Sequence, residues 1–150
     1  MLISTKGRYA LRVMADLAGH SNDGYVILMD IAQRQGISEK YLEGIVAALS
    51  RSGFLQTQRG RGGGYRLTCR PEEYTVGDIL RAAEGSLAPV NCIKAGDSDC
   101  PNADSCLTLP LWKELDQVMN RYLDSVSLAD LINGNVAAKT PFDEPEGKTS

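Results

Sequence analysis

Apolar residues recur at intervals of three and four near the start of the chain, which is the spacing of a helix with one buried face. They are Tyr9, Ala10, Val13, Met14, Leu17 and Ala18. Ser4 and Thr5 precede them and suit a helix N-cap, and Gly19 with the turn-rich residues 21–24 ends the pattern. The sequence therefore predicts a first helix between Ser4 and Gly19.

Residues 28–54 read as two helices joined by a tight turn. Ala32, Gly36 and Leu42 stand where a helix-turn-helix needs a small contact residue, a turn glycine and a core aliphatic residue. Ser38 would cap the second helix. The buried face of that helix would be Leu42, Ile45, Val46 and Leu49. A generic helical hairpin shares this pattern, so these residues alone favour DNA binding without establishing it.

The next segment, residues 54–69, predicts two short strands around the tip RGRGGG. Leu55, Thr57, Tyr65 and Leu67 alternate as strand residues do. A glycine-rich nucleotide-binding loop lies between a strand and a helix, whereas these glycines lie between two strands, so we exclude a nucleotide site here. A hairpin directly after a helix-turn-helix indicates a wing, whose arginines suit DNA phosphates or a narrow minor groove.

The second half of the chain predicts two further helices on either side of a loop. Residues 75–85 place Val76, Ile79, Leu80 and Ala83 on one helical face, and a continuous helical pattern runs from Pro110 to Leu131. Its apolar stripe is wide enough to require packing on the body, on a second copy of the chain, or on both.

These elements together predict a mainly α protein with a small β-hairpin wing. We expect a winged helix-turn-helix DNA-binding region at residues 1–70, a connecting helix at 71–90 and a cysteine-containing sensor loop at 91–109. A C-terminal dimerisation helix at 110–132 and a disordered tail at 133–150 would follow.

Charge divides the chain in two. Residues 1–70 carry 10 Lys/Arg and 5 Asp/Glu, a net charge of +5, whereas residues 71–150 carry 6 and 14, a net charge of −8. A basic half suggests an anionic partner, most commonly nucleic acid. The sequence shows no membrane span and no secretory signal, so we expect a soluble cytoplasmic protein. One histidine, no catalytic triad pattern and no nucleotide fingerprint argue against an enzyme with a small-molecule substrate.

Three of the four cysteines, Cys92, Cys100 and Cys106, gather in the loop. Cytoplasmic thiols are kept reduced, so clustered cysteines there indicate metal binding or redox sensing more than structural disulfides. We interpret Cys69, beside the wing, as a structural thiol and His20 as an exposed helix-end residue.

Several motifs together resemble the IscR-type winged-helix regulators, a family that includes iron–sulphur cluster and nitric-oxide sensors. They are STKGRYA (4–10), IAQRQGIS with YLE (31–43), RGRGGGYRL (59–67), VGDIL (76–80) and the cysteine loop up to CLTLPLW (92–112). The resemblance covers roughly residues 1–132. It implies a homodimer that binds double-stranded operator DNA and represses or activates transcription.

The resemblance also implies which residues meet DNA. The helix beginning at Ser38 would enter the major groove, with Glu43 discriminating between bases because a carboxylate accepts a hydrogen bond from cytosine. Arg61 replaces the proline common at its wing position and adds charge. The implied DNA-binding set is Lys6, Arg8, Ser38, Lys40, Tyr41, Glu43, Arg59, Gly60, Arg61 and Gly62.

In family members that carry an iron–sulphur cluster, three loop cysteines ligate it, and Cys92, Cys100 and Cys106 match them. The 2Fe–2S form follows the closest resemblance, while three thiolates with an open position also suit 4Fe–4S. The fourth ligand is unknown, because Leu109 stands where the iron–sulphur regulator has histidine.

Other solutions for the fourth ligand stay open. Arg8 excludes the carboxylate used near that position by some nitric-oxide sensors, whereas Asp97, Asp99 and Asp104 lie in the loop and could donate an oxygen. The alternatives to a cluster are a metal-free thiol switch and a zinc site. A winged-helix adaptor that binds protein instead of DNA is the alternative to a DNA-binding regulator.

Overall fold

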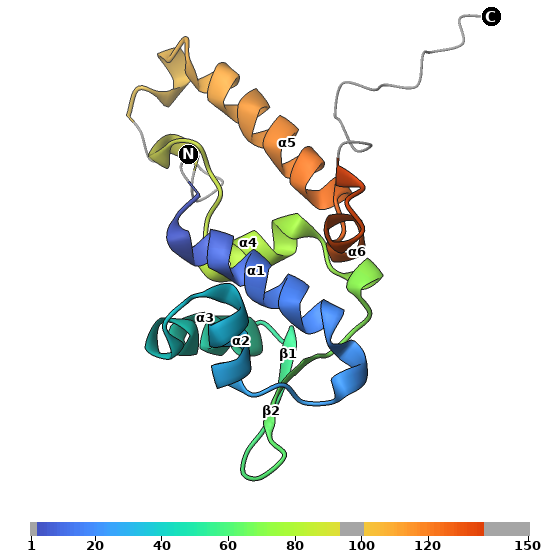
Figure 1. Ribbon diagram of the computed structural model, residues 1–150. Coiled ribbons are helices and arrows are strands. Elements are labelled where there is room, and N and C mark those ends of the chain that lie inside the picture. The colour runs from blue at the N-terminus through green and yellow to red at the C-terminus, as the bar shows by residue number, and fades with distance from the viewer. Residues whose placement is uncertain (1–2, 94–100, 137–150) are drawn as a thin grey trace, which may run out of the picture.

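The computed structural model describes residues 3–93 and 101–136 (Figure 1). Within these ranges the fold is mainly helical with one two-stranded antiparallel hairpin, which confirms the predicted fold class. The helices are α1 (Thr5–Gly19), α2 (Leu28–Gln35), α3 (Glu39–Arg51), α4 (Val76–Glu84), α5 (Leu109–Ser125) and α6 (Leu128–Ile132), and the strands are β1 (Leu55–Gln58) and β2 (Gly64–Leu67).

The first three helices follow their sequence signals. Ser4 caps α1, its hydroxyl accepting a hydrogen bond from the Lys6 N–H at 3.2 Å. Ser38 caps α3 in the same way, from the Tyr41 N–H. Between α2 and α3, Gly36 takes the left-handed conformation at φ 64°, which glycine adopts without steric cost. The predicted helix-turn-helix is confirmed.

The hairpin pairs Leu55 with Leu67 and Thr57 with Tyr65, as the alternation of strand residues predicted. A third segment extends it at one point. Val26 and Tyr65 exchange two backbone hydrogen bonds of 2.8 Å, so the chain before α2 lies against β2. This bridge ties β2 of the wing to the segment that leads into the helix-turn-helix.

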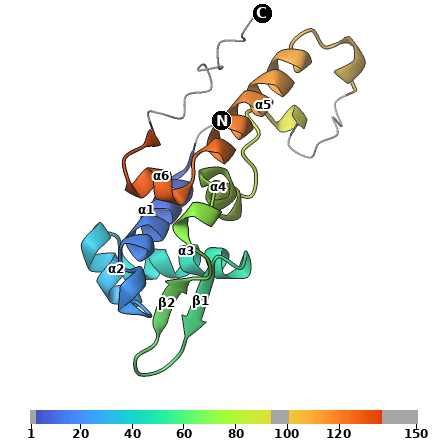
Figure 2. The same cartoon turned by 90° about the vertical axis from the view of Figure 1, so that its right-hand side faces the viewer.

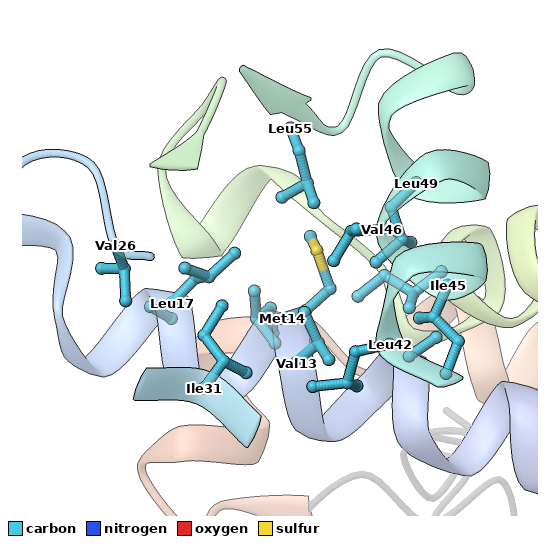
Figure 3. Packing of buried hydrophobic residues seen from close by; sticks show 14 of the residues in the cluster. Val13, Met14, Leu17, Val26, Ile31, Leu42, Ile45, Val46, Leu49 and Leu55 are labelled. Atoms are coloured by element: carbon cyan, nitrogen blue, oxygen red, sulfur yellow. The ribbon is translucent and has the colours of Figure 1, made fainter. Parts of the chain in front are cut away.

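One apolar cluster fills the centre of the molecule, with side chains of α1, α2, α3 and β1 directed into it (Figure 3). Met14, Leu42 and Leu49 are fully buried there. Ile79 of α4 and Leu128 of α6 belong to the same cluster. Packing is therefore continuous across residue 70, where we placed the end of the DNA-binding region.

The continuous helix predicted from Pro110 to Leu131 is wrong, because the chain breaks between α5 and α6. Val126 is extended, and its carbonyl accepts the Val76 N–H at 2.8 Å. Ser127 then caps α6 in a capping box with Asp130. The hydrogen bond from Val76 and the Ser127 cap stabilise the break more than a continuous helix would be stabilised. Helix α6 therefore turns back and packs on α1.

The hairpin and α5 lie at opposite ends of the molecule, with α1 and α4 side by side between them (Figures 1 and 2). Arg81 of α4 fixes α5, donating to both carboxylate oxygens of Asp124 (2.8 and 3.0 Å) and to Asn120. Val136 packs against the small cluster beside α4, and the rest of the predicted tail lies outside the described residues. None of the described helices is long and apolar enough to cross a membrane.

Candidate nucleic-acid interface and cysteine loop

The start of α3 carries the side chains predicted to face DNA, including Glu43, which was predicted to discriminate between bases. Ser38, Lys40, Tyr41 and Glu43 are all exposed, while the opposite face of the helix is buried in the core. The structure thus brings these four residues together on one accessible helix end.

Sequence reasoning missed two residues of the same face. Gly44 and Ala47 are exposed and follow Lys40 at the helical intervals of four and seven. Their small size leaves α3 flat beside Glu43, so that another surface can approach the helix closely. The spacing alone could have identified them.

The start of α1 lies beside the start of α3. A shallow hollow of about 380 Å³ separates them, lined by Thr5, Tyr9, Gly36, Ile37, Ser38 and Tyr41. The rings of Tyr9 and Tyr41 meet edge to face at 5.6 Å. Lys6 and Arg8 are both exposed. Two residues correspond to about 200° around a helix, so these two cations flank the hollow instead of sharing one face.

The wing tip carries exposed cations on an exposed backbone. Arg59, Gly60, Arg61 and Gly62 are all exposed. Gly60 and Gly62 have φ values of 87° and 71°, which side-chain-bearing residues rarely adopt. The Gly63 N–H closes the turn onto the Gly60 carbonyl at 3.0 Å. This turn holds the two arginines at the outer end of the hairpin.

A buried tyrosine fixes the base of the wing. The Tyr74 hydroxyl accepts the N–H groups of Thr68 (3.0 Å) and Cys69 (2.9 Å) and donates to the Phe54 carbonyl (3.0 Å). Its ring packs edge to face on Phe54. These bonds join the end of β2 to the residue preceding β1, so they fix where the hairpin leaves the body.

A buried carboxylate anchors α2 to α1. Asp16 is only 7% exposed and accepts two hydrogen bonds from Arg34, at 2.7 and 3.0 Å, and one from Gln35 at 2.9 Å. Burial raises the pKa of Asp16, but these hydrogen bonds and the charge of Arg34 outweigh it and hold the pKa below its ordinary value. Arg12 adds a hydrogen bond to Gln35 at 3.0 Å. The helix-turn-helix is therefore fixed on α1 by charge as well as by packing.

His20 and Cys69 differ from our interpretation of them. His20 is half-buried at the end of α1, with Nδ1 2.8 Å from the Asp16 carbonyl oxygen. Cys69 is exposed beside the wing, and its sulphur is 3.7 Å from the Thr68 hydroxyl oxygen. An exposed thiol fills no core space, so Cys69 is not structural in the sense we expected.

Two of the three loop cysteines lie within the described residues, and Cys100 lies outside them. Cys92 is exposed in the short 3-10 turn Asn91–Ile93, which follows α4. Cys106 is partly exposed three residues before the start of α5, with its sulphur 3.3 Å from the Thr108 hydroxyl. Among residues 3–93 and 101–136 there is no group of three potential metal ligands, so the predicted three-thiol set is untested.

The start of α5 favours the thiolate form of Cys106. Hydrogen bonds from the Thr108 side chain and from the backbone N–H groups of Thr108 and Leu109 lower the pKa of this thiol. A thiolate is the donor that iron and zinc require, and it is also the reactive form in thiol oxidation. Leu109, at the position of the family histidine, is buried.

Comparison with known proteins agrees with this arrangement. Residues 3–134 match the Rrf2 family model, described as an iron-dependent transcriptional regulator. The HTH-type transcriptional regulator IscR of Aliivibrio salmonicida is 40% identical over 135 residues, 90% of this chain and 79% of the relative. Protein rrf2 of Nitratidesulfovibrio vulgaris is 40% identical over 132 residues, 88% of this chain and 87% of the relative.

Two solved structures are also similar. CymR, the global cysteine regulator of B. subtilis, aligns with a TM-score of 0.73 at 37% identity, over 89% of this chain and 98% of that one. IscR of T. potens aligns with a TM-score of 0.71 at 37% identity, over 93% and 92%. The family model and the IscR relative are both described as transcriptional regulators, which agrees with the prediction of a regulator and not an enzyme. With the fold and the sequence both matching over nearly the whole described chain, the protein belongs to the Rrf2 family of DNA-binding transcriptional regulators.

Proposed function

We propose that this regulator binds a two-fold symmetric operator as a homodimer and adjusts that binding to the state of an iron–sulphur cluster held by Cys92, Cys100 and Cys106. The observation that carries the sensing proposal is the position of Cys106. A thiol whose ionised form is stabilised lies three residues before the first residue, Leu109, of the helix proposed to join the two subunits. We place its action in the cytoplasm, together with its operator DNA.

In the DNA-reading step, the exposed start of α3 enters the major groove. Lys40 supplies positive charge toward the phosphates, and Glu43 accepts hydrogen bonds from cytosine amino groups. Arg59 and Arg61 at the wing tip contact the backbone or a narrow minor groove. Lys6 and Arg8 add phosphate contacts from α1.

A homodimer is supported by the apolar residues that α5 leaves uncovered. Leu107, Leu111 and Leu115 are 95%, 58% and 38% exposed, and they follow one another at intervals of four residues. This stripe lies on and just before the helix farthest from the wing (Figure 2). A second copy of α5 would cover the stripe and leave both recognition helices free for two half-sites.

The loop cysteines would hold the cluster through their thiolates, with Cys106 already favoured in that form. When bound, the cluster would supply a redox-active and chemically labile group. Ligation by residues on both sides of the loop would tie the segment after α4 to the start of α5. This restraint would fix the position of α4 relative to α5, and with it the distance and angle between the DNA-binding surfaces of the two subunits.

A metal-free thiol switch is the second candidate. It is supported by the exposure of Cys92 and the lowered pKa of Cys106. It is also supported by likeness to Staphylococcus aureus CymR, solved in an oxidised form, at 33% identity and a TM-score of 0.67. In this case oxidation of the loop thiols would take the place of cluster loss.

Anaerobic purification followed by iron and sulphide analysis and Mössbauer spectroscopy separates the two candidates. Cluster sensing predicts coloured protein with iron and sulphide in comparable amounts, both lost in Cys106→Ser and retained in Cys69→Ser as the matched control. Colourless protein that takes up no iron on anaerobic reconstitution, yet forms a disulfide with an oxidant, would favour the thiol switch.

Operator binding is tested with a duplex selected by the protein from a randomised pool. Arg59→Ala should weaken binding to all sequences, whereas Glu43→Ala should mainly relax base preference. Binding should also weaken steeply as salt rises, because phosphate contacts release counterions. Unchanged selectivity in Glu43→Ala would contradict the role given to this residue, and no selective DNA shift by the wild type would favour a protein-binding adaptor.

A further inference from the structure

One carboxylate oxygen of α4 holds the beginning of α1. Glu84 Oε1 accepts hydrogen bonds from the Ser4 N–H at 2.9 Å, the Ser4 hydroxyl at 2.6 Å and the Gly7 N–H at 3.0 Å. A helix start has backbone N–H groups without partners inside the helix. Glu84 satisfies two such groups from another element, across 80 and 77 residues of sequence.

The arrangement is a capping box completed from a distance. In an ordinary capping box, the third helical residue is a glutamate whose side chain returns to the N-cap N–H. Here Ser4 is the N-cap, the third helical residue is Gly7, and the first turn has no acidic residue. A Cβ atom at position 7 would lie 2.5 Å from Glu84 Oε1 and 3.1 Å from Leu80 Cδ2, so glycine makes the close approach feasible.

The position of Glu84 indicates that it serves α1 and not its own helix. A negative charge is unfavourable in the last turn of a helix and favourable at the first turn of one. Glu84 is the last residue of α4, yet its charge meets the N-terminus of α1. Its contribution to α4 is therefore adverse, and its contribution to α1 is favourable.

The first turn of α1 carries DNA-facing cations on both sides of this contact. Lys6 and Arg8 flank Gly7 in sequence, and both are exposed while Gly7 is buried. Glu84 is also the last residue of α4, and the chain continues from it through the capping residue Gly85 toward Cys92. Glu84 therefore connects the helix with Lys6 and Arg8 to the segment that leads into the cysteine loop.

We propose that Glu84 is a positioning residue for operator binding, which holds the first turn of α1 so that Lys6 and Arg8 reach DNA phosphates together with the start of α3. The proposal rests on the DNA-binding role of Lys6 and Arg8 given above. Glu84 itself is not a DNA contact in this account, since a carboxylate would repel the phosphates.

The test compares Glu84→Ala with wild type on the selected duplex over a range of salt concentrations. Loss of the Lys6 and Arg8 contacts in both subunits should reduce the magnitude of the slope of log affinity against log salt by up to about 4, because each of the four phosphate contacts contributes about 0.9. Hydrogen exchange should show the Gly7 amide losing its protection in Glu84→Ala. Glu84→Gln retains an acceptor oxygen and should restore most of the salt slope.

Glu72→Ala is the matched control, because Glu72 is an exposed glutamate in the turn before α4. It should leave the salt slope and Gly7 protection as in wild type. Gly7→Ala disrupts the same contact from α1, because its methyl group displaces the Glu84 carboxylate. It replaces Glu84→Ala in the test if that variant does not fold.

The outcomes separate this inference from the proposed function. The inference alone is overturned if the wild type binds DNA selectively and Glu84→Ala loses protection of the Gly7 amide but keeps the wild-type salt slope. A wild-type protein without selective DNA binding overturns the proposed function first. A reduced slope in Glu84→Ala and Gly7→Ala, but not in Glu72→Ala, supports the positioning role.

Discussion

Replacing Tyr74 with phenylalanine removes one oxygen atom from the base of the wing and keeps the ring. The ring contact with Phe54, at 5.5 Å between centroids, can remain. Two of the three backbone partners of the Tyr74 hydroxyl, the Thr68 N–H and the Phe54 carbonyl, keep a hydrogen bond to each other at 3.3 Å. The Phe54 carbonyl also accepts one from the Thr68 hydroxyl at 3.3 Å. The Cys69 N–H loses its partner. We therefore expect the free energy of unfolding to fall by about 1 to 2 kcal/mol.

Urea unfolding followed by circular dichroism measures this loss. The midpoint should fall while the dependence on urea stays unchanged, and the Cys69 amide should exchange faster with solvent. Tyr25→Phe is the matched control, because the Tyr25 ring lies under the Arg66 guanidinium at 4.6 Å and that contact needs no hydroxyl. Its cost should stay within about 0.5 kcal/mol. Equal small losses in the two variants would refute the assigned role of the Tyr74 hydroxyl.

Two further predictions follow from the pKa directions. Asp16→Asn should destabilise the protein at neutral pH by about 1 to 2 kcal/mol, less than the loss of a fully buried ion pair, because the Arg34 side chain is 34% exposed and water can solvate its charge. The wild-type advantage should shrink as pH falls below the ordinary pKa of 3.8 and through the lower folded value, as measured by urea unfolding; a constant difference down to pH 2 would count against the pair. Thr108→Ala should raise the pKa of Cys106, so that iodoacetamide labels this thiol in metal-free protein only at higher pH; Ser105→Ala, which alters a neighbouring hydroxyl, should leave the labelling profile in place.

Local signals made the DNA-reading end predictable. The caps at Ser4 and Ser38 and the turn at Gly36 depend on neighbouring residues, so the sequence displays them directly. The single-residue bridge of Val26 to Tyr65 was not predictable, because it depends on where the hairpin folds back in space. The Glu84 contact has the same character, since it joins residues about eighty positions apart.

The break between α5 and α6 shows how two local signals can compete. The apolar spacing runs on through Val126 and Leu131, which favoured one helix. Ser127 and Asp130 form a capping box that starts a new helix within this apolar spacing, and the hydrogen bond from the Val76 N–H holds Val126 in the extended conformation between the two helices. For the cysteine loop, the sequence identified the thiols but not the stabilisation of Cys106, which depends on where α5 begins.

Because α6 returns to the centre of the molecule, the core is completed only late in the synthesis of the chain. Leu128 is fully buried in the cluster that supports α1 and α3, and its N–H donates to the Tyr74 carbonyl at 2.9 Å. At about 5 to 20 residues per second, Leu128 is synthesised roughly 6 to 25 seconds after the start of α1. A nascent chain still lacking α6 leaves this part of the core exposed to solvent. This part of the core can therefore close only after α6 has left the ribosome.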